Sequence, residues 1–230
     1  MQGTALDDPI RAGEMSELAG RRGVVPVIGP RPPSADVSEA ADDVDMARAQ
    51  EYALLATLLA RTPDAALLER LARLKVDASP LGLAHAALAE AAQAADAERV
   101  EREFFNLFIG LGRGELLPYA SYYLAGFLHE RPLARLRGDL AELGIARAEG
   151  QHEPEDHIAI LCEVMAGLAG GRFAAPPGAA RQIFDKHLAP WARRFFTDLE
   201  RAEAADFYRR VGALGRTFIE IETEAFALPS

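Results

Sequence analysis

Three carboxylates and an imidazole occur within five residues, at Glu153, Glu155, Asp156 and His157, directly before the apolar run IAILCEVMAGLAG. Proline is tolerated in the first turn of a helix, and acidic side chains there meet the positive end of the helix dipole. The pattern therefore predicts that residues 153–157 form the opening turn of a buried helix. An ordinary helix start explains Pro154 and the acids, whereas a site for a cationic ligand also explains the histidine.

A metal site is one chemical alternative for this cluster. Zinc hydrolases place two histidines four residues apart on one helix face, so that both reach the same ion. His152 and His157 are five apart with Pro154 between them, so they would not converge and no metal is predicted. Cys162 stands among apolar residues, where a small buried thiol without a catalytic partner is expected.

A phosphate-binding loop is the second alternative, because glycines occur at Gly110, Gly112 and Gly114. Phosphate loops follow a strand and end in Gly-Lys-Ser/Thr, whereas this stretch follows a predicted helix and lacks that ending. No serine stands in a G-x-S-x-G elbow either. The sequence thus favours a binding protein over an enzyme, without a cofactor. A nucleotide-binding helical regulatory protein and a metal-dependent hydrolase remain the alternatives.

Two aromatic groups accompany the acidic segment. They are Phe104, Phe105 and Phe108 on one predicted helix, and Pro118, Tyr119, Tyr122 and Tyr123 in the loop and short helix that follow. Carboxylates pair with guanidinium groups in bidentate geometry, and aromatic walls accept apolar helices. Together these residues would form a groove for a peptide that is basic at one end and apolar along its length. The alternative is that Phe104 and Phe108 belong to the core.

The composition favours one all-helical domain. Half of the 230 residues are hydrophobic, alanine and leucine are abundant, and β-branched residues are sparse. The single cysteine excludes an internal disulfide framework and fits a reducing compartment. A net charge of −10 argues against nucleic acid as a partner. No apolar run reaches the roughly 18 residues of a membrane-spanning helix.

The chain divides into a tail and a body. Residues 1–45 have no sustained apolar period and are rich in proline and glycine, which predicts a flexible N-terminal tail. Arg21 and Arg22 precede a short apolar stretch that is broken by Pro26, too short for an export signal. Residues 46–230 are predicted to form a single all-α globular domain of about nine to ten helices.

Helical periodicity and capping residues give the expected boundaries. Thr62, Ser79 and Asp96 are the predicted N-caps of three helices. The predicted helices cover residues 46–61, 62–75, 79–95, 96–110, 119–127, 132–143, 153–169, 181–188, 191–202 and 206–226.

Four blocks, in order, resemble the TorD/DmsD family of cytoplasmic redox-enzyme maturation chaperones. The blocks are FFNLFIG at residues 104–110, LPYASYYL at 117–124, EPEDH at 153–157 and KHLAPW at 186–191. The resemblance covers residues 46–226. Its later part, through FIEIETEAF at 218–226, is more similar to the branch associated with formate dehydrogenases.

The resemblance implies a cytoplasmic, TorD-like chaperone, a monomer or a homodimer, that catalyses no reaction. It implies binding of the twin-arginine signal peptide of a molybdenum-cofactor oxidoreductase, such as a formate dehydrogenase or a DMSO-reductase-like enzyme. The chaperone would hold this client for cofactor insertion before export. The family's peptide-binding positions correspond to Phe104, Leu107, Phe108, Pro118, Tyr119, Ser121, Asp156 and His157, with Glu153 and Glu155 as further acids.

Two departures from the family pattern and one pH effect accompany this prediction. Phe104 stands where tryptophan or tyrosine is common, and the tail has no counterpart in compact members. The acids beside His157 are expected to favour its charged form, which would oppose a bound guanidinium. Binding is therefore expected to weaken in mild acid.

Overall fold

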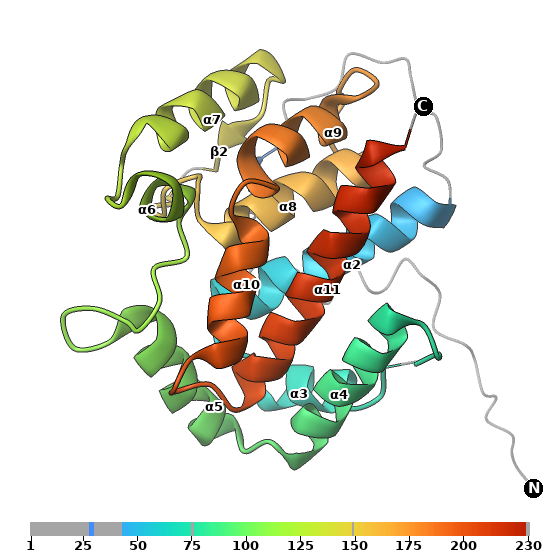
Figure 1. Cartoon of the computed structure of the whole chain (residues 1–230), viewed down its shortest axis with the longest axis vertical. Helices are drawn as coiled ribbons and strands as arrows, with labels where there is room; N and C mark the ends of the chain where they lie inside the picture. The colour runs from blue at the N-terminus through green and yellow to red at the C-terminus, as the bar shows by residue number, and fades with distance from the viewer. Residues whose placement is uncertain (1–27, 30–42, 75, 149, 229–230) are drawn as a thin grey trace, which may run out of the picture.

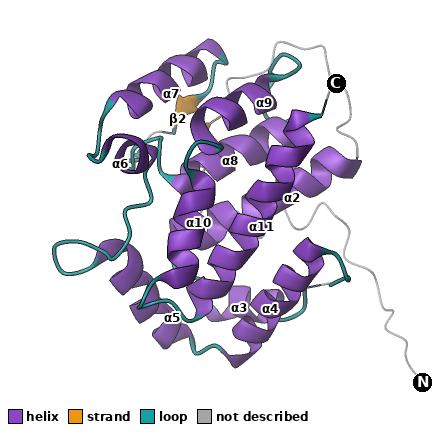
Figure 2. Cartoon of the chain, in the orientation of Figure 1, coloured by secondary structure: helices purple, strands orange, loops and turns teal. Residues whose placement is uncertain are grey.

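A computed structural model describes residues 28–29, 43–74, 76–148 and 150–228. Helices make up most of this part and strands very little of it, as Figure 2 shows, so the predicted all-α fold is confirmed. The α-helices are α2 (Asp43–Ala60), α3 (Ala65–Leu71), α4 (Pro80–Ala94), α5 (Ala97–Phe104), α6 (Ala120–Ala125), α7 (Arg131–Glu142), α8 (Ile158–Ala169), α9 (Ala179–Ile183), α10 (Ala192–Arg201) and α11 (Phe207–Ala227). Two π-helical turns, η1 (Phe105–Ile109) and η2 (Phe184–Leu188), continue α5 and α9.

The centre of the molecule is a two-layer packing of four helices. α2 packs against α8, and α10 packs against α11 in front of them (Figure 1). The largest fully buried side chains of the core come from α2, α10, α11, η2 and the turn before α10, and they are Trp191, Tyr52, Tyr208, Phe184, Phe195 and Phe196. The shorter helices surround this centre, with α3, α4 and α5 at one end and α6 and α7 at the other (Figure 1).

Two of the three predicted N-caps are confirmed. The Ser79 hydroxyl accepts a hydrogen bond from the backbone N–H of Gly82 at 3.0 Å, and the Asp96 carboxylate accepts one from Arg99 at 3.0 Å. The prediction of Thr62 as the cap of α3 is wrong, because Asp64 performs this role. Asp is a strong N-cap residue, and a residue that precedes proline, as Thr62 does, is held in extended conformation.

A short pairing that the sequence did not predict joins β1 (Ile28–Gly29) to β2 (Ala146–Arg147) in antiparallel register. Apart from Ile28 and Gly29, residues 1–42 of the expected tail lie outside the described part of the chain. Helix α2 begins at Asp43. Among the described helices, none is long and apolar enough to cross a membrane.

Close packing of α10 on α11 depends on glycine. A methyl group on Gly212 would lie 2.6 Å from the backbone nitrogen of Glu200, whereas one on Gly138, in α7, would meet nothing within 4 Å. We expect Gly212→Ala to lower the free energy of unfolding by about 1–3 kcal/mol, because backbone must move. Gly138→Ala should raise it by up to about 1 kcal/mol through helix propensity. Urea denaturation followed by circular dichroism compares the two, and equal stabilities would contradict the packing.

Candidate functional site

The acidic segment is a turn before α8 rather than the first turn of that helix. The prediction of a helix from Glu153 is therefore wrong. The backbone N–H of His157 donates to the carbonyl of Pro154 at 3.1 Å and closes a tight turn. His157 then acts as the N-cap of α8, since its Nδ1 accepts a hydrogen bond from the N–H of Ala159 at 3.1 Å.

Backbone pairing joins this turn to the loop before α6. The N–H of Ile158 donates to the carbonyl of Pro118 at 2.9 Å, and the N–H of Ala120 donates to the carbonyl of Asp156 at 3.0 Å. The two bonds form an antiparallel bridge. The LPYASYYL and EPEDH blocks are distant in the sequence and meet only in the folded chain.

Asp156 holds the first turn of α6 in place. Its carboxylate accepts hydrogen bonds from the backbone N–H of Ser121 at 2.8 Å and from the Ser121 hydroxyl. Only 1% of Asp156 is exposed, and Ser121 is fully buried. Asp156 therefore has a structural role that any binding role must accommodate.

The other two acids have different partners. Glu155 accepts a hydrogen bond from Nε of Arg137 at 2.9 Å and forms an ion pair with Nη2 of the same arginine at 2.8 Å, and Arg147 lies 4.0 Å away. Burial alone would raise the pKa of Glu155, but the hydrogen bond from Arg137 and the two positive charges hold it below its usual value. Glu153 is half-buried and accepts a hydrogen bond from the Tyr119 hydroxyl. Burial and this carboxylate raise the pKa of Tyr119.

His157 is neutral at physiological pH. Burial lowers its pKa from 6.5 to about 4, and its Nδ1 serves as a hydrogen-bond acceptor, which requires that nitrogen to be unprotonated. The expectation that neighbouring acids favour the charged imidazolium is therefore wrong, because desolvation outweighs them. The Tyr119 ring meets the imidazole edge-on, with 5.1 Å between the ring centroids.

The aromatic residues predicted on the first block lie elsewhere. Leu107 is fully buried, and Phe104 and Phe108 are half-buried against Tyr208 of α11, at 5.7 and 5.5 Å between ring centroids. Figure 1 shows α5 and α6 as separate parts of the molecule, joined by a loop. The structure thus gathers Pro118, Tyr119, Ser121, Glu153, Asp156 and His157 in one place, turns Glu155 toward α7, and sets the α5–η1 residues apart.

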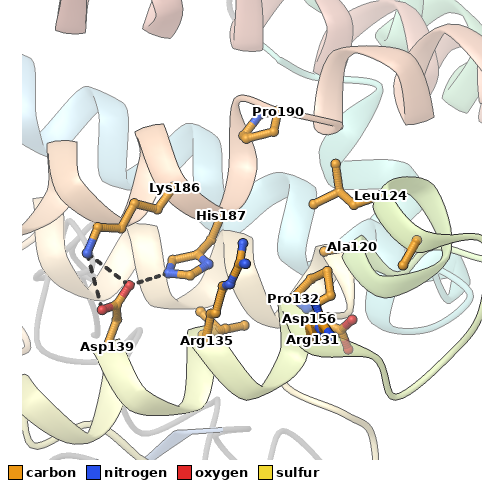
Figure 3. Close-up of a pocket in the computed structure, with 12 residues that line it drawn as sticks. Ala120, Leu124, Arg131, Pro132, Arg135, Asp139, Asp156, Lys186, His187 and Pro190 are labelled. Atoms are coloured by element: carbon orange, nitrogen blue, oxygen red, sulfur yellow. Dashed lines mark hydrogen bonds and ion pairs between the residues drawn. The ribbon is translucent and has the colours of Figure 1, made fainter.

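A large cavity that the sequence did not predict opens between α6, α7 and η2 (Figure 3). Its volume is about 730 Å³. Asp156 is the one member of the predicted set that lines it. The remaining lining residues are Ala120, Leu124, Ala125, Arg131, Pro132, Arg135, Leu136, Asp139, Lys186, His187 and Pro190.

Asp139 anchors one side of this cavity. Its carboxylate accepts hydrogen bonds from Lys186 at 3.2 Å and contacts Nε2 of His187 at 2.6 Å, as the dashed lines in Figure 3 show. Burial would raise the pKa of Asp139, but these two partners lower it. The KHLAPW block gave a signal for Lys186 and His187, whereas nothing in the sequence distinguished Asp139.

Exposed apolar side chains recur along the chain from η1 to the loop after α6. Six of the twelve large ones in the described part of the chain form what we call the apolar surface: Phe105, Ile109, Leu111, Leu124, Phe127 and Leu128. The loop after η1 is tied to α6, because Arg113 donates a hydrogen bond to the Tyr122 hydroxyl at 2.8 Å. The glycines of this loop follow a helix, as expected of a connector. The described residues contain no group of three or more His, Cys, Asp or Glu that could hold a metal ion.

A family model and several curated relatives match overlapping parts of this chain. The model of the nitrate reductase delta subunit family matches residues 75–197. The chaperone protein TorD of Aliivibrio fischeri is 29% identical over 135 residues, which cover 54% of this chain and 63% of the relative. A Tat proofreading chaperone, DmsD of Haemophilus influenzae, is 30% identical over 119 residues, covering 51% and 57%. The chain therefore matches less than two thirds of the length of these relatives.

A solved structure shares the fold. The crystal structure of a redox enzyme maturation protein from Archaeoglobus fulgidus superimposes with a TM-score of 0.51 and 19% sequence identity. The match covers 83% of this chain and 99% of that one.

Proposed function

Because the chain belongs to the TorD/DmsD family of redox-enzyme maturation chaperones, we propose that it binds the twin-arginine signal peptide of a molybdenum-cofactor oxidoreductase. It would hold this client in the cytoplasm until the cofactor has been inserted, and it would make or break no covalent bond. A formate dehydrogenase or a DMSO-reductase-like enzyme is the proposed client.

The observation that carries this proposal is the arrangement of acid and apolar side chains around α6. Asp156 and Glu153 lie at the N-terminal end of α6, whereas Leu124, Phe127 and Leu128 are exposed toward and beyond its C-terminal end. Six helical residues span about 9 Å. A leader peptide could therefore place its arginine pair at the acids and its apolar stretch along the apolar surface.

The acids differ in how they would receive a guanidinium. Among the described residues, Glu153 forms no ion pair within 4.0 Å, and its partner is the neutral Tyr119 hydroxyl. A guanidinium could replace that hydroxyl and form a charge-assisted, bidentate contact. Asp156 would add its negative charge below the bound guanidinium, while it continues to accept hydrogen bonds from Ser121 at the start of α6. Pro118, Ser121 and His157 would position these acids, and Leu107, Phe104 and Phe108 would support the apolar surface from the core side.

Two charge-removing variants test this proposal. We expect Glu153→Gln and Asp156→Asn each to weaken binding of a synthetic leader peptide by about 1–3 kcal/mol, because each loses a charged hydrogen-bond acceptor. Asparagine still offers Ser121 an acceptor oxygen, so Asp156→Asn should remain folded. Calorimetry gives the affinities, and circular dichroism checks the fold.

The controls concern both the protein and the peptide. Glu142→Gln removes the same charge from an exposed position in α7 and should leave binding unchanged. A peptide with glutamine in place of both arginines should bind the wild-type chain weakly and be insensitive to Glu153→Gln. Wild-type affinity in both acid variants would refute the assignment of the site. Failure of the wild-type chain to bind any leader would refute the proposed function.

A further inference from the structure

The cavity between α6, α7 and η2 has a charge opposite to that of the whole chain. Three cationic side chains line it, Arg131, Arg135 and Lys186, against the two carboxylates of Asp139 and Asp156. The chain as a whole has a formal net charge of −10. A concave site lined by one sign of charge concentrates ligands of the other sign.

Both carboxylates are already engaged by the protein. Asp139 contacts Lys186 and His187, which offset its charge. Asp156 is almost fully buried and accepts two hydrogen bonds from Ser121. The charges that remain available to a ligand are therefore those of Arg131 and Arg135.

These two arginines are placed unfavourably for the stability of α7. Among the residues that the structure describes, neither forms an ion pair within 4.0 Å, and both are exposed. Arg131 is the first residue of α7, where a positive charge opposes the helix dipole. Arg135 stands four residues later, where a like charge repels it. Figure 3 shows Arg135 extending across the cavity toward η2.

Apart from His187, the rest of the wall is apolar. Leu124, Leu136, Pro132 and Pro190 line the cavity together with two alanines. Such a wall favours a ligand that carries an apolar body as well as a charge, since pockets for small molecules combine apolar walls with a few placed polar groups.

We propose that this cavity binds a compact organic anion, a phosphate or carboxylate group on a small apolar body. Arg131 and Arg135 would hold the oxygens by charge-assisted hydrogen bonds. The apolar body would lie against Leu124, Leu136 and Pro190. This inference does not depend on the proposed function, because it concerns a ligand of opposite charge to a twin-arginine peptide.

The chain contains a reporter beside the cavity. Trp191, its single tryptophan, follows Pro190 and donates its indole N–H to the carbonyl of His187 at 2.7 Å. Titration with phenyl phosphate, benzoate and inorganic phosphate should change Trp191 fluorescence, with the two aromatic anions binding more tightly than inorganic phosphate. Tighter binding of phenyl phosphate would assign a phosphate ligand, and tighter binding of benzoate a carboxylate ligand.

Variants of the two arginines decide the assignment. Arg131→Gln combined with Arg135→Gln should weaken binding of the better aromatic probe by about tenfold or more, or about 1.4 kcal/mol. Arg70→Gln, at an exposed position in α3, should leave it unchanged. Calorimetry with benzylamine, a cation of similar shape, should show no binding. Absence of binding by every anion, equal binding of benzylamine, or full affinity in the double variant would each overturn the proposal.

Discussion

Replacement of Glu103 by alanine is expected to lower the free energy of unfolding by about 3 kcal/mol. The Glu103 carboxylate, in α5, accepts hydrogen bonds from the backbone N–H groups of Asp206, Phe207 and Tyr208 at 2.8, 3.1 and 2.6 Å. It therefore caps the N-terminus of α11 from another helix. Alanine would leave these donors without this acceptor, at a cost of about 1 kcal/mol or more for each buried one.

A neighbouring residue provides the control. Glu101→Ala, at an exposed position of the same helix, should change the free energy of unfolding by about 0.5 kcal/mol or less. Glu103→Gln should give an intermediate loss, because its amide oxygen can still accept. Urea unfolding followed by Trp191 fluorescence measures all three. Stability of Glu103→Ala within experimental error of Glu101→Ala would mean that water replaces the carboxylate without penalty.

Removal of the His157 imidazole is expected to flatten the dependence of stability on pH. The folded-state pKa of His157, about 4, lies below the usual 6.5, so the unfolded chain binds the proton first. Stability is therefore intact above pH 6.5 and decreases as the pH falls toward 4. The expected loss from this group at pH 4.5 is about 2–3 kcal/mol.

His157→Asn tests this effect while it keeps the cap, because asparagine is a favourable N-cap residue. Between pH 7.5 and 4.5 the variant should lose about 2–3 kcal/mol less than the wild-type chain in urea denaturation. His85→Gln should do the opposite: a hydrogen bond to Glu51 raises the pKa of His85, so its contribution is present at low pH and is lost as the pH rises. Equal slopes for wild type and His157→Asn would show that the imidazole protonates freely in the folded state.

Much of the fold could be predicted because its signals are local. Apolar residues at helical spacing and the caps Ser79 and Asp96 act within a few residues, so periodicity and composition identified the helices. The start of α8 was misplaced because Pro154 and three acids satisfy the rules for a first turn equally well when they precede it. The π-helical turns η1 and η2 were missed, since no simple spacing distinguishes them from α-helix.

The site was predictable only where a motif marked it. Tyr119, Ser121 and Asp156 belong to recognised blocks, and the fold brings them together. The cavity was missed because part of its lining comes from η2, which is distant in the sequence from α6 and α7. Exposed arginines such as Arg131 and Arg135 also resemble those of any solvated helix face. The engagement of Asp156 by Ser121 also depends on tertiary pairing, so its burial could not be anticipated.

The antiparallel bridge between the loops before α6 and α8 has a consequence for variation of the chain. Residues 120–156 begin and end at adjacent points, which are held together by backbone hydrogen bonds and by the Asp156 side chain. The two ends of this segment are thus fixed relative to each other. Changes in the length of the exposed loop between α6 and α7, residues 126–130, can therefore be absorbed without altering where α8 enters the core, so this loop can vary while the central helices stay the same.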